Sequence, residues 1–282
     1  MIEQFQHRLT NSFFLWFDNY LLTKGQAYSN LTGTFFNYDD ERFDSTYKVF
    51  GSAYKQWVND SSISGANIPS GVYVNGVFSG RNENLILDFE NGRVLSSELP
   101  ANTAITGSFA VKDFNVYFSN ETEEDLIIEN KYDINSRIIL NDESYVMPYD
   151  YVVPAIFLSV DSVQNKGFAL GGMEETTVMA KAVVIAENNY QLDGVLSIFA
   201  DSRNEVFRPI PMANHPMDEF GDLKSGKYSY IDLKNQFADN QNFYINNANT
   251  SKLTDKSRKS LTSDIYVGFV DFEIQQHRYR HQ

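Results

Sequence analysis

The sequence predicts a mainly β protein with some α structure. We expect a small antiparallel β-sandwich or barrel-like module, and a sheet covered by a helix. An N-terminal helix and a long irregular arm complete the α+β fold. Two observations lead to this prediction. Aromatic residues make up 15% of the 282 residues, with 22 Phe and 17 Tyr, and both types favour pleated, half-buried surfaces. Two Asn-Gly pairs also stand between short apolar runs, which is the strongest local signal for a hairpin.

The first element is expected to be a helix that begins near Thr10, Asn11 or Ser12, any of which could cap it. Three apolar side chains at spacings of three and four share one face: Phe14, Phe17 and Leu21. Lys24-Gly25 is the expected end, with the glycine in the left-handed conformation. Such a helix is apolar over more than half its circumference, so it has to be buried in its own core or against a neighbouring subunit.

Residues 25–70 combine an irregular, polar sequence with many aromatic side chains. A disordered linker would be poor in aromatic residues, so we expect an ordered arm that packs on something. Amphipathic aromatic residues in irregular chain often anchor a partner. The predicted interface residues, from the helix and the arm, are Phe14, Trp16, Phe17, Phe35, Phe36, Tyr38, Phe43, Tyr47, Tyr54 and Trp57. A well-filled β core is the alternative explanation for such residues.

Residues 71–140 are typical of short antiparallel strands. Two hairpins are predicted at the turns Asn75-Gly76 and Asn91-Gly92, followed by strands at 104–109 and 115–118. The four acids within Glu121–Asp125 indicate a solvated turn.

The second half of the chain is predicted to form a sheet with a helix laid over it. Strands are expected at 152–160, 176–186 and 265–274, and a helix at 191–202. Residues 206–260 are polar and resemble a long surface excursion. The predicted organisation is therefore residues 1–70 as helix and arm, 71–145 as a β module, and 146–282 as an α+β module.

Charge and composition exclude several kinds of partner. The net charge is −14, which disfavours phosphate backbones and anionic membrane surfaces. The longest apolar runs are too short to span a bilayer, and the N-terminus lacks the layout of a signal peptide. The chain has no cysteine, which rules out disulfides, thiolate metal sites and cysteine nucleophiles.

No catalytic motif is found, so we expect no enzyme activity and no cofactor. The sequence lacks a Walker loop, a dinucleotide fingerprint and a nucleophile elbow. Among the four histidines, His277 and His281 are four residues apart but follow a strand, so a surface role is favoured over a metal site. Two carboxylates that are distant in sequence could still form a glycosidase site. Acids near apolar elements are Asp161, Asp193, Asp201 and Glu205, and a turn or cap role is favoured for Asp193.

Two segments resemble proteins of tailed-bacteriophage virions. The first is VYVNGVFSG…LILDFENGRVLSSELPANTAITGSFAVKDFNVYFSN, from Val72 to Asn120, which is similar to a β-module that recurs in fibres, adaptors and neck proteins. The second is NSFFLWFDNYLLTKGQAYSN, from Asn11 to Asn30, which looks like virion structural proteins encoded near neck and tail genes. Together these segments cover under half of the chain.

The resemblance implies a structural protein of the virion, assembled in the host cytoplasm. It would form a homo-oligomeric ring at the neck or head–tail junction, as a connector or a tail terminator or completion protein. Its partners would be further copies of itself and the neighbouring neck, head or tail proteins. The aromatic arm would reach a neighbour, and an acidic channel would let DNA pass without specific binding. Two alternatives stay open. The first is a β-sandwich on the virion surface that recognises host glycan through exposed Tyr and Trp, or that binds another virion protein. The second is a carboxylate hydrolase.

Overall fold

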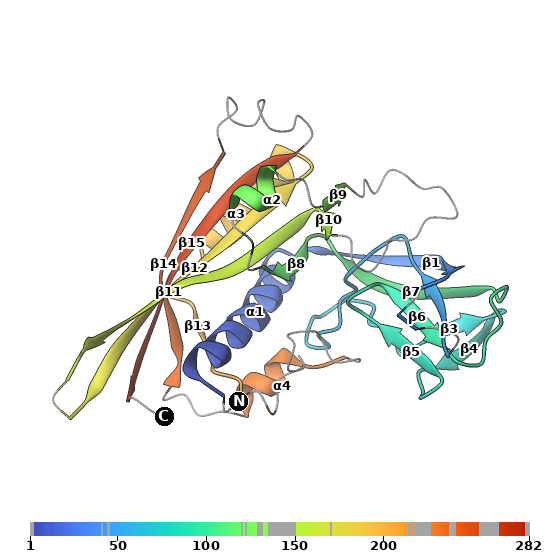
Figure 1. Ribbon diagram of the computed structural model, residues 1–282, viewed down its shortest axis with the longest axis horizontal. Helices are drawn as coiled ribbons and strands as arrows, with labels where there is room; N and C mark the ends of the chain where they lie inside the picture. The colour runs from blue at the N-terminus through green and yellow to red at the C-terminus, as the bar shows by residue number, and fades with distance from the viewer. Residues whose placement is uncertain are drawn as a thin grey trace.

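The chain folds around two sheets, and Figure 1 shows the first on the right and the second fanning out on the left. This is a computed structural model. The residues that it describes are 3–40, 42–43, 46–119, 121, 123–128, 132–134, 151–169, 171–211, 213, 216, 227–236, 241–253 and 265–279. The predicted fold class is confirmed: the protein is mostly β with some helix, and it combines a nearly closed, barrel-like sheet with a curled sheet.

The barrel-like sheet has seven strands in the order β4-β3-β7-β1-β2-β6-β5. Their bounds are β1 Tyr28–Tyr38, β2 Lys48–Gly51, β3 Gly71–Val74, β4 Val77–Gly80, β5 Leu85–Asp88, β6 Arg93–Ser96 and β7 Ile105–Lys112. All the pairs in this sheet are antiparallel. The core of the barrel is formed by side chains that include Phe35, Phe50, Trp57 and Phe109.

The curled sheet has six strands in the order β13-β14-β15-β12-β11-β8. Their bounds are β8 Asn115–Phe118, β11 Ala155–Gly167, β12 Met173–Ala186, β13 Val206–Phe207, β14 Phe243–Lys252 and β15 Tyr266–Tyr279. Only β8 runs parallel to its neighbour, β11. Two short strands, β9 Tyr132–Ile134 and β10 Tyr151–Val153, form a separate parallel pair.

Helices cover both faces of the curled sheet. The first helix, α1 Phe5–Lys24, and α3 Asn189–Ala200 pack on one face, where they share a core with β12 and β15. On the other face, α2 Glu123–Ile128 contributes Leu126 and Ile127 to a smaller cluster. The short helix α4 Tyr230–Asn235 lies beside α1.

The core around α1 is largely aromatic. The ring of Phe17 stacks on Phe199 of α3 at 4.0 Å between centroids, and Trp16 stacks on Phe207 of β13 at 5.5 Å. The edge of Phe13 meets Phe272 of β15 at 5.3 Å. These side chains are at most 4% exposed. Of the two predicted possibilities, burial in the chain's own core or against a neighbouring subunit, the structure shows the first.

The predicted helix start and C-cap need correction. The helix begins at Phe5, because Leu9 and Phe13 are both fully buried and the first two turns pack on the sheet. Ser12 is no cap: its hydroxyl donates to the Arg8 carbonyl and accepts the Ile210 amide. The helix ends at Lys24 as predicted, but Gly25 has a right-handed φ of −86°.

The prediction that residues 25–70 form an irregular arm is wrong for residues 28–38 and 48–51, which are the strands β1 and β2. β1 pairs with β7 over eight residue pairs, from Tyr28–Lys112 to Phe35–Ile105, and β2 lies between β1 and β6. Phe35, Phe50 and Trp57 of this segment lie in the barrel core, whereas Tyr38, Phe43 and Tyr47 pack together in a separate small cluster. The predicted boundary at residue 70 does not separate two units, because residues 28–51 and 71–112 form one sheet. The boundary at 145 lies outside the described residues.

Three further predictions, for residues beyond 120, need correction. Glu123–Ile128 is a helix where a turn was expected. Residues 206–260 are no surface excursion where they are described, because β14 pairs with β15 from Tyr244 to Lys252 and because Phe207, Tyr230 and Phe243 are buried. The helix at 191–202 and the final strand are confirmed as α3 and β15. Asn188 rather than Asp193 caps α3, since its side chain accepts the Gln191 amide.

The two Asn-Gly pairs form different turns. Asn75 and Gly76 have φ values of +48° and +82° and directly join β3 to β4, as a two-residue type I′ turn requires. The second hairpin has a four-residue loop, because Asp88 pairs with Arg93 and only Gly92 has positive φ. A Cβ atom on Gly92 would lie 1.8 Å from the Tyr54 carbonyl oxygen, whereas the space around Gly76 is open.

This difference predicts unequal effects of alanine at the two glycines. Gly76→Ala should lower the free energy of unfolding by about 1–2 kcal/mol, the cost of a left-handed L-residue. Gly92→Ala should lower it considerably more, because the backbone at Tyr54 has to move as well. Urea unfolding of both variants measures the difference, and equal losses would contradict the close approach at Gly92.

Candidate functional site

The predicted interface residues lie mainly in the monomer's own core. Six are buried: Phe14, Trp16, Phe17, Phe35, Tyr38 and Trp57. Phe36, Phe43, Tyr47 and Tyr54 are partly buried. The buried side chains offer no surface to a partner, so the interface prediction is wrong for them. Both tryptophans of the chain are in this group, which also removes Trp from any glycan-binding surface.

One predicted interface residue, Tyr38, belongs to a polar cluster around Arg93. Arg93 of β6 is 4% exposed in its side chain and bonds to Asp40 at 2.6 Å, Asp88 at 2.7 Å and the Tyr38 hydroxyl at 3.2 Å. Its guanidinium also lies over the Phe43 ring. Hydrogen bonds from Arg42 and Arg93 hold the pKa of Asp40 well below its usual range. Asp40 therefore has a structural role as the ion-pair partner of Arg42 and Arg93.

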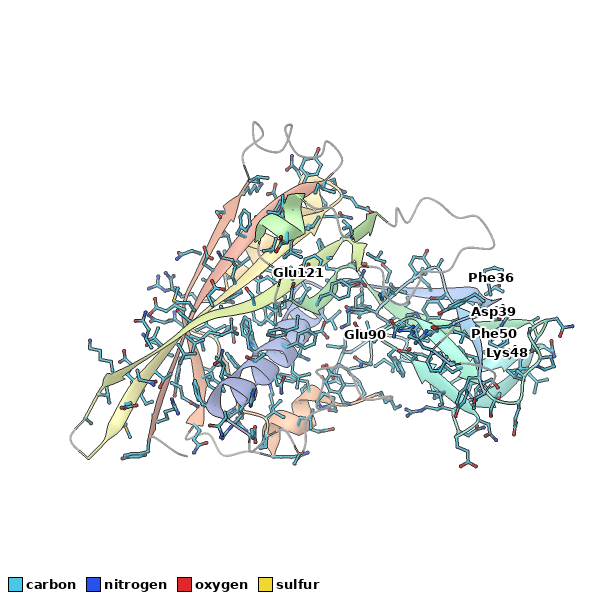
Figure 2. The ribbon with its side chains drawn as sticks, in the orientation of Figure 1. Phe36, Asp39, Lys48, Phe50, Glu90 and Glu121 are labelled. Atoms are coloured by element: carbon cyan, nitrogen blue, oxygen red, sulfur yellow. The ribbon has the colours of Figure 1, made fainter. Side chains whose placement is uncertain are left out.

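A buried polar joint connects the barrel to the rest of the molecule. We define this joint by Asp18 of α1, Gln56, Asp60, Glu90 and Lys112 of β7. Lys112 Nζ lies 2.7 Å from Asp18 Oδ1, and both side chains are at most 3% exposed. Figure 2 shows Glu90 at the end of the barrel that faces the rest of the chain, away from Phe36, Asp39 and Lys48.

Gln56 links the barrel to the first strand of the curled sheet. Its amide nitrogen donates to Glu90 Oε1 at 2.7 Å and to the Val116 carbonyl at 2.8 Å. Its amide oxygen accepts the Val116 amide at 2.7 Å. One side chain thereby bonds both backbone groups of a β8 residue. Removal from water raises the pKa of Glu90, although Lys112 and Gln56 oppose the shift.

Asp60 completes the joint by collecting donors from three segments. One carboxylate oxygen accepts the Asn19 side chain of α1 at 2.7 Å. The other accepts the Ser62 amide and hydroxyl and the Tyr230 amide at the start of α4. Burial raises the pKa of Asp18 nearby, although Lys112 acts in the opposite direction. The joint fixes how the barrel sits on α1.

The exposed apolar residues are different from the predicted interface residues. On the β3–β4 hairpin, Tyr73 is 45%, Val77 71% and Phe78 53% exposed, and the two rings meet edge to face at 5.6 Å. Sequence reasoning identified this hairpin but assigned no surface role to it. Alternation along the strands could have indicated it, because Val72 is buried while Tyr73 beside it faces outward.

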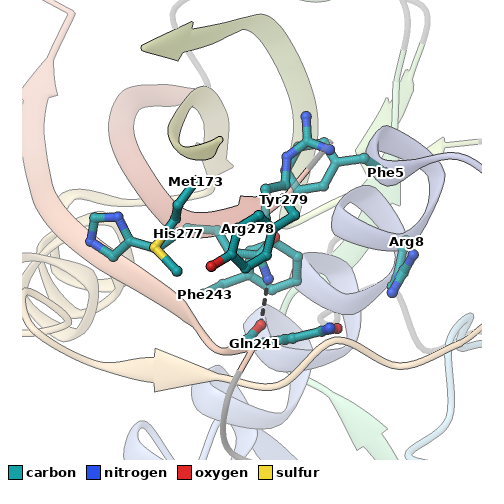
Figure 3. A pocket seen from close by; sticks show the side chains of 9 residues that line it. Phe5, Arg8, Met173, Gln241, Phe243, His277, Arg278 and Tyr279 are labelled. Carbon is teal, nitrogen blue, oxygen red and sulfur yellow. Dashed lines mark hydrogen bonds between the residues drawn. The ribbon is translucent and has the colours of Figure 1, made fainter. Parts of the chain in front are cut away.

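Pockets lie on the surface of the curled sheet, one of them a shallow hollow between α3 and β14 that Asp193 and Lys252 help to line. Another, of about 240 Å³, lies between the start of α1 and the end of β15 (Figure 3). Its lining residues are Phe5, Arg8, Met173, Gln241, Phe243, Gln276, His277, Arg278 and Tyr279. Arg278 lies over the Phe5 ring and donates to Thr176 and Asn165. No carboxylate lines this pocket, so it offers no pair of acids for hydrolysis.

A third pocket, of about 420 Å³, lies on the opposite face and does contain acids. Glu121 and Asp161 line it, together with Ser159 and Lys181. Asp161 is exposed and accepts the Ser159 hydroxyl at 3.3 Å, and Lys181 lies 3.8 Å from Asp271 of β15. The other predicted carboxylates lie elsewhere: Asp193 forms an ion pair with Lys252, and Asp201 caps the end of α3. Asp161 and Asp193 thus line separate pockets, and none of the described pockets brings two of the four predicted acids together.

Searches for known chemistry and known relatives give no match. No group of three or more His, Asp or Glu within the described ranges could hold a metal ion. No helix among the described residues is long and apolar enough to cross a membrane. Neither protein-family models nor curated proteins match this chain.

The joint predicts a strong coupling between Asp18 and Lys112. Replacing either residue alone, as in Asp18→Leu or Lys112→Met, should lower the free energy of unfolding by about 3–5 kcal/mol, because one buried charge then lacks its partner. The double variant should lose much less than the two single losses added together. Urea unfolding of the four proteins measures the coupling, and additive losses would show that the pair does not act as a unit.

Proposed function

We propose that this chain is a non-enzymatic structural subunit of a tailed-phage virion, forming a homo-oligomeric ring at the neck or head–tail junction. The observation that supports this proposal is the curled sheet, which ends in an open strand edge on each side within the described part of the chain. An open edge is a template for another strand, and proteins that stay monomeric usually blunt such edges. Two open edges on opposite sides suit a subunit with a neighbour on each side.

The shape of the sheet is consistent with this role. The outer half of the β11–β12 hairpin extends beyond the helix-covered part of the sheet, at the lower left of Figure 1. Residues 164–169 of this hairpin are exposed, and Phe168 is 56% exposed. A projecting hairpin of this kind could extend to a neighbouring subunit without changing the packing of the core.

Charge and the sequence resemblance add to the proposal. A chain with a net charge of −14 repels DNA, which suits a wall along which DNA slides without binding. The segments from Asn11 to Asn30 and from Val72 to Asn120 resemble virion proteins of tailed phages. The barrel would then be an appended module, held at a fixed angle by the buried joint.

Two measurements test the proposed function. Light scattering and negative-stain images of the purified chain should show a closed particle of several copies. Quantitative mass spectrometry of virions from the encoding phage should find the chain at the copy number of one ring per particle. A chain that stays monomeric at all concentrations and is missing from virions would overturn the proposal. High copy number with loss of host adsorption on antibody binding would instead favour a surface receptor-binding role.

A further inference from the structure

The open edge of β11 begins where β8 ends. β12 pairs with β11 along its whole length, but β8 pairs only with Ala155–Leu158. No other described strand pairs with residues 159–167. Residues 164–167 are exposed, which is consistent with a free edge.

The open edge of β14 lies on the opposite side of the sheet. β15 pairs with β14 from Tyr244 to Lys252, whereas β13 pairs only with Phe243 and Tyr244. The backbone of Ile245 bonds to Asn204 and Glu205. Beyond this residue, no described strand lies along 246–252, and residues 249–252 are exposed.

Both edges contain a regular run of matching length. The pairing of β11 shifts between Val160 and Ser162, and that of β14 shifts between Ile245 and Asn247. Such bulges interrupt a ladder. Outside them, residues 162–167 and 247–252 pair regularly with their inner neighbours, which gives two uninterrupted runs of six residues.

The strand directions suit pairing between copies. β11 is antiparallel to β12, β12 to β15, and β15 to β14, so β11 and β14 run in opposite directions. A second copy placed beside the first in the same orientation therefore presents its β14 antiparallel to the first copy's β11. We infer that residues 162–167 of one copy pair with residues 247–252 of a second copy, which extends the curled sheet from subunit to subunit.

The two faces of the sheet restrict the register. Val163 and Ala248 both pack against the core that contains α1, so their side chains point to the same face. Directly opposite residues in a ladder share a face. Gln164 must therefore oppose Asn249 or Ser251, whose side chains point to the other face, and never Thr250.

Side-chain chemistry is compatible with the register that pairs Gln164 with Asn249. Small and amide side chains then meet across the new ladder, and no like charges face each other. The pairs are Ser162–Ser251, Val163–Thr250, Gln164–Asn249, Asn165–Ala248 and Lys166–Asn247. Because two different edges meet, the contact is head to tail and produces a ring if the rotation closes. This inference rests on the proposed function, for which it names the partner and the surface.

Cysteine cross-linking tests the pairing directly, since the chain has no cysteine of its own. Directly opposed Cβ atoms in an antiparallel ladder are about 4.5–5.5 Å apart, close to the span of a disulfide. Under oxidation, assembled Gln164→Cys/Asn249→Cys should give a ladder of covalent multimers on a denaturing gel. A register shifted by two residues would give the ladder with Gln164→Cys/Ser251→Cys instead.

The matched control is Gln164→Cys/Thr250→Cys. Thr250 is exposed like Asn249, but its side chain points to the other face, so this variant should give no ladder. Each single-cysteine variant should also give none, and melting curves check that all variants fold. Ladders of equal strength in the Asn249 and Thr250 variants would indicate random collision and overturn the inference.

Light scattering on the same samples separates this inference from the proposed function. If light scattering shows multimers but neither the Asn249 nor the Ser251 variant forms covalent multimers on the gel, the edge pairing is overturned and the ring assembly stays in place. A ladder formed by a chain that is missing from virions would support the edge pairing and overturn the proposed virion role.

Discussion

The burial of α1 is the constraint on which the rest of the structure depends. A helix with apolar residues on nearly all sides has to be enclosed. The curled sheet and α3 enclose it through stacked rings such as Phe17 on Phe199. The same helix carries Asp18, whose carboxylate reaches Lys112 of the barrel. One element therefore organises the larger core and also positions the module that lies outside it.

The joint between the barrel and α1 favours a fixed arrangement over a flexible one. A buried ion pair contributes little net stability compared with apolar residues, but it strongly disfavours arrangements in which its partners separate. Gln56, Asp60 and Glu90 surround the pair with satisfied hydrogen bonds. In the proposed ring, a defined angle between the two modules would matter, because errors in angle would accumulate from subunit to subunit.

Local signals in the sequence predicted local structure well. The turn at Asn75-Gly76, the end of α1 and the final strand depend on residues close together in the chain. The strand β1 escaped prediction because its partner β7 is remote in sequence, and because Phe35 and Phe36 adjoin in a polar context. Aromatic density therefore suggested an arm where it marks a barrel core. The edges of β11 and β14 that no described strand covers could not be predicted either, since an edge is defined by how strands distant in the sequence are arranged.

Hydrogen exchange of the monomer at low concentration tests the central role of α1 most directly. Amides of a helix on which the core depends should exchange only through global unfolding. We expect residues 9–22 to exchange as slowly as the centres of β12 and β15, and the open runs at 162–167 and 247–252 to exchange much faster. Fast exchange in α1 alongside slow exchange in β12 and β15 would contradict the account, because the sheet would then be stable without the helix that it is proposed to enclose.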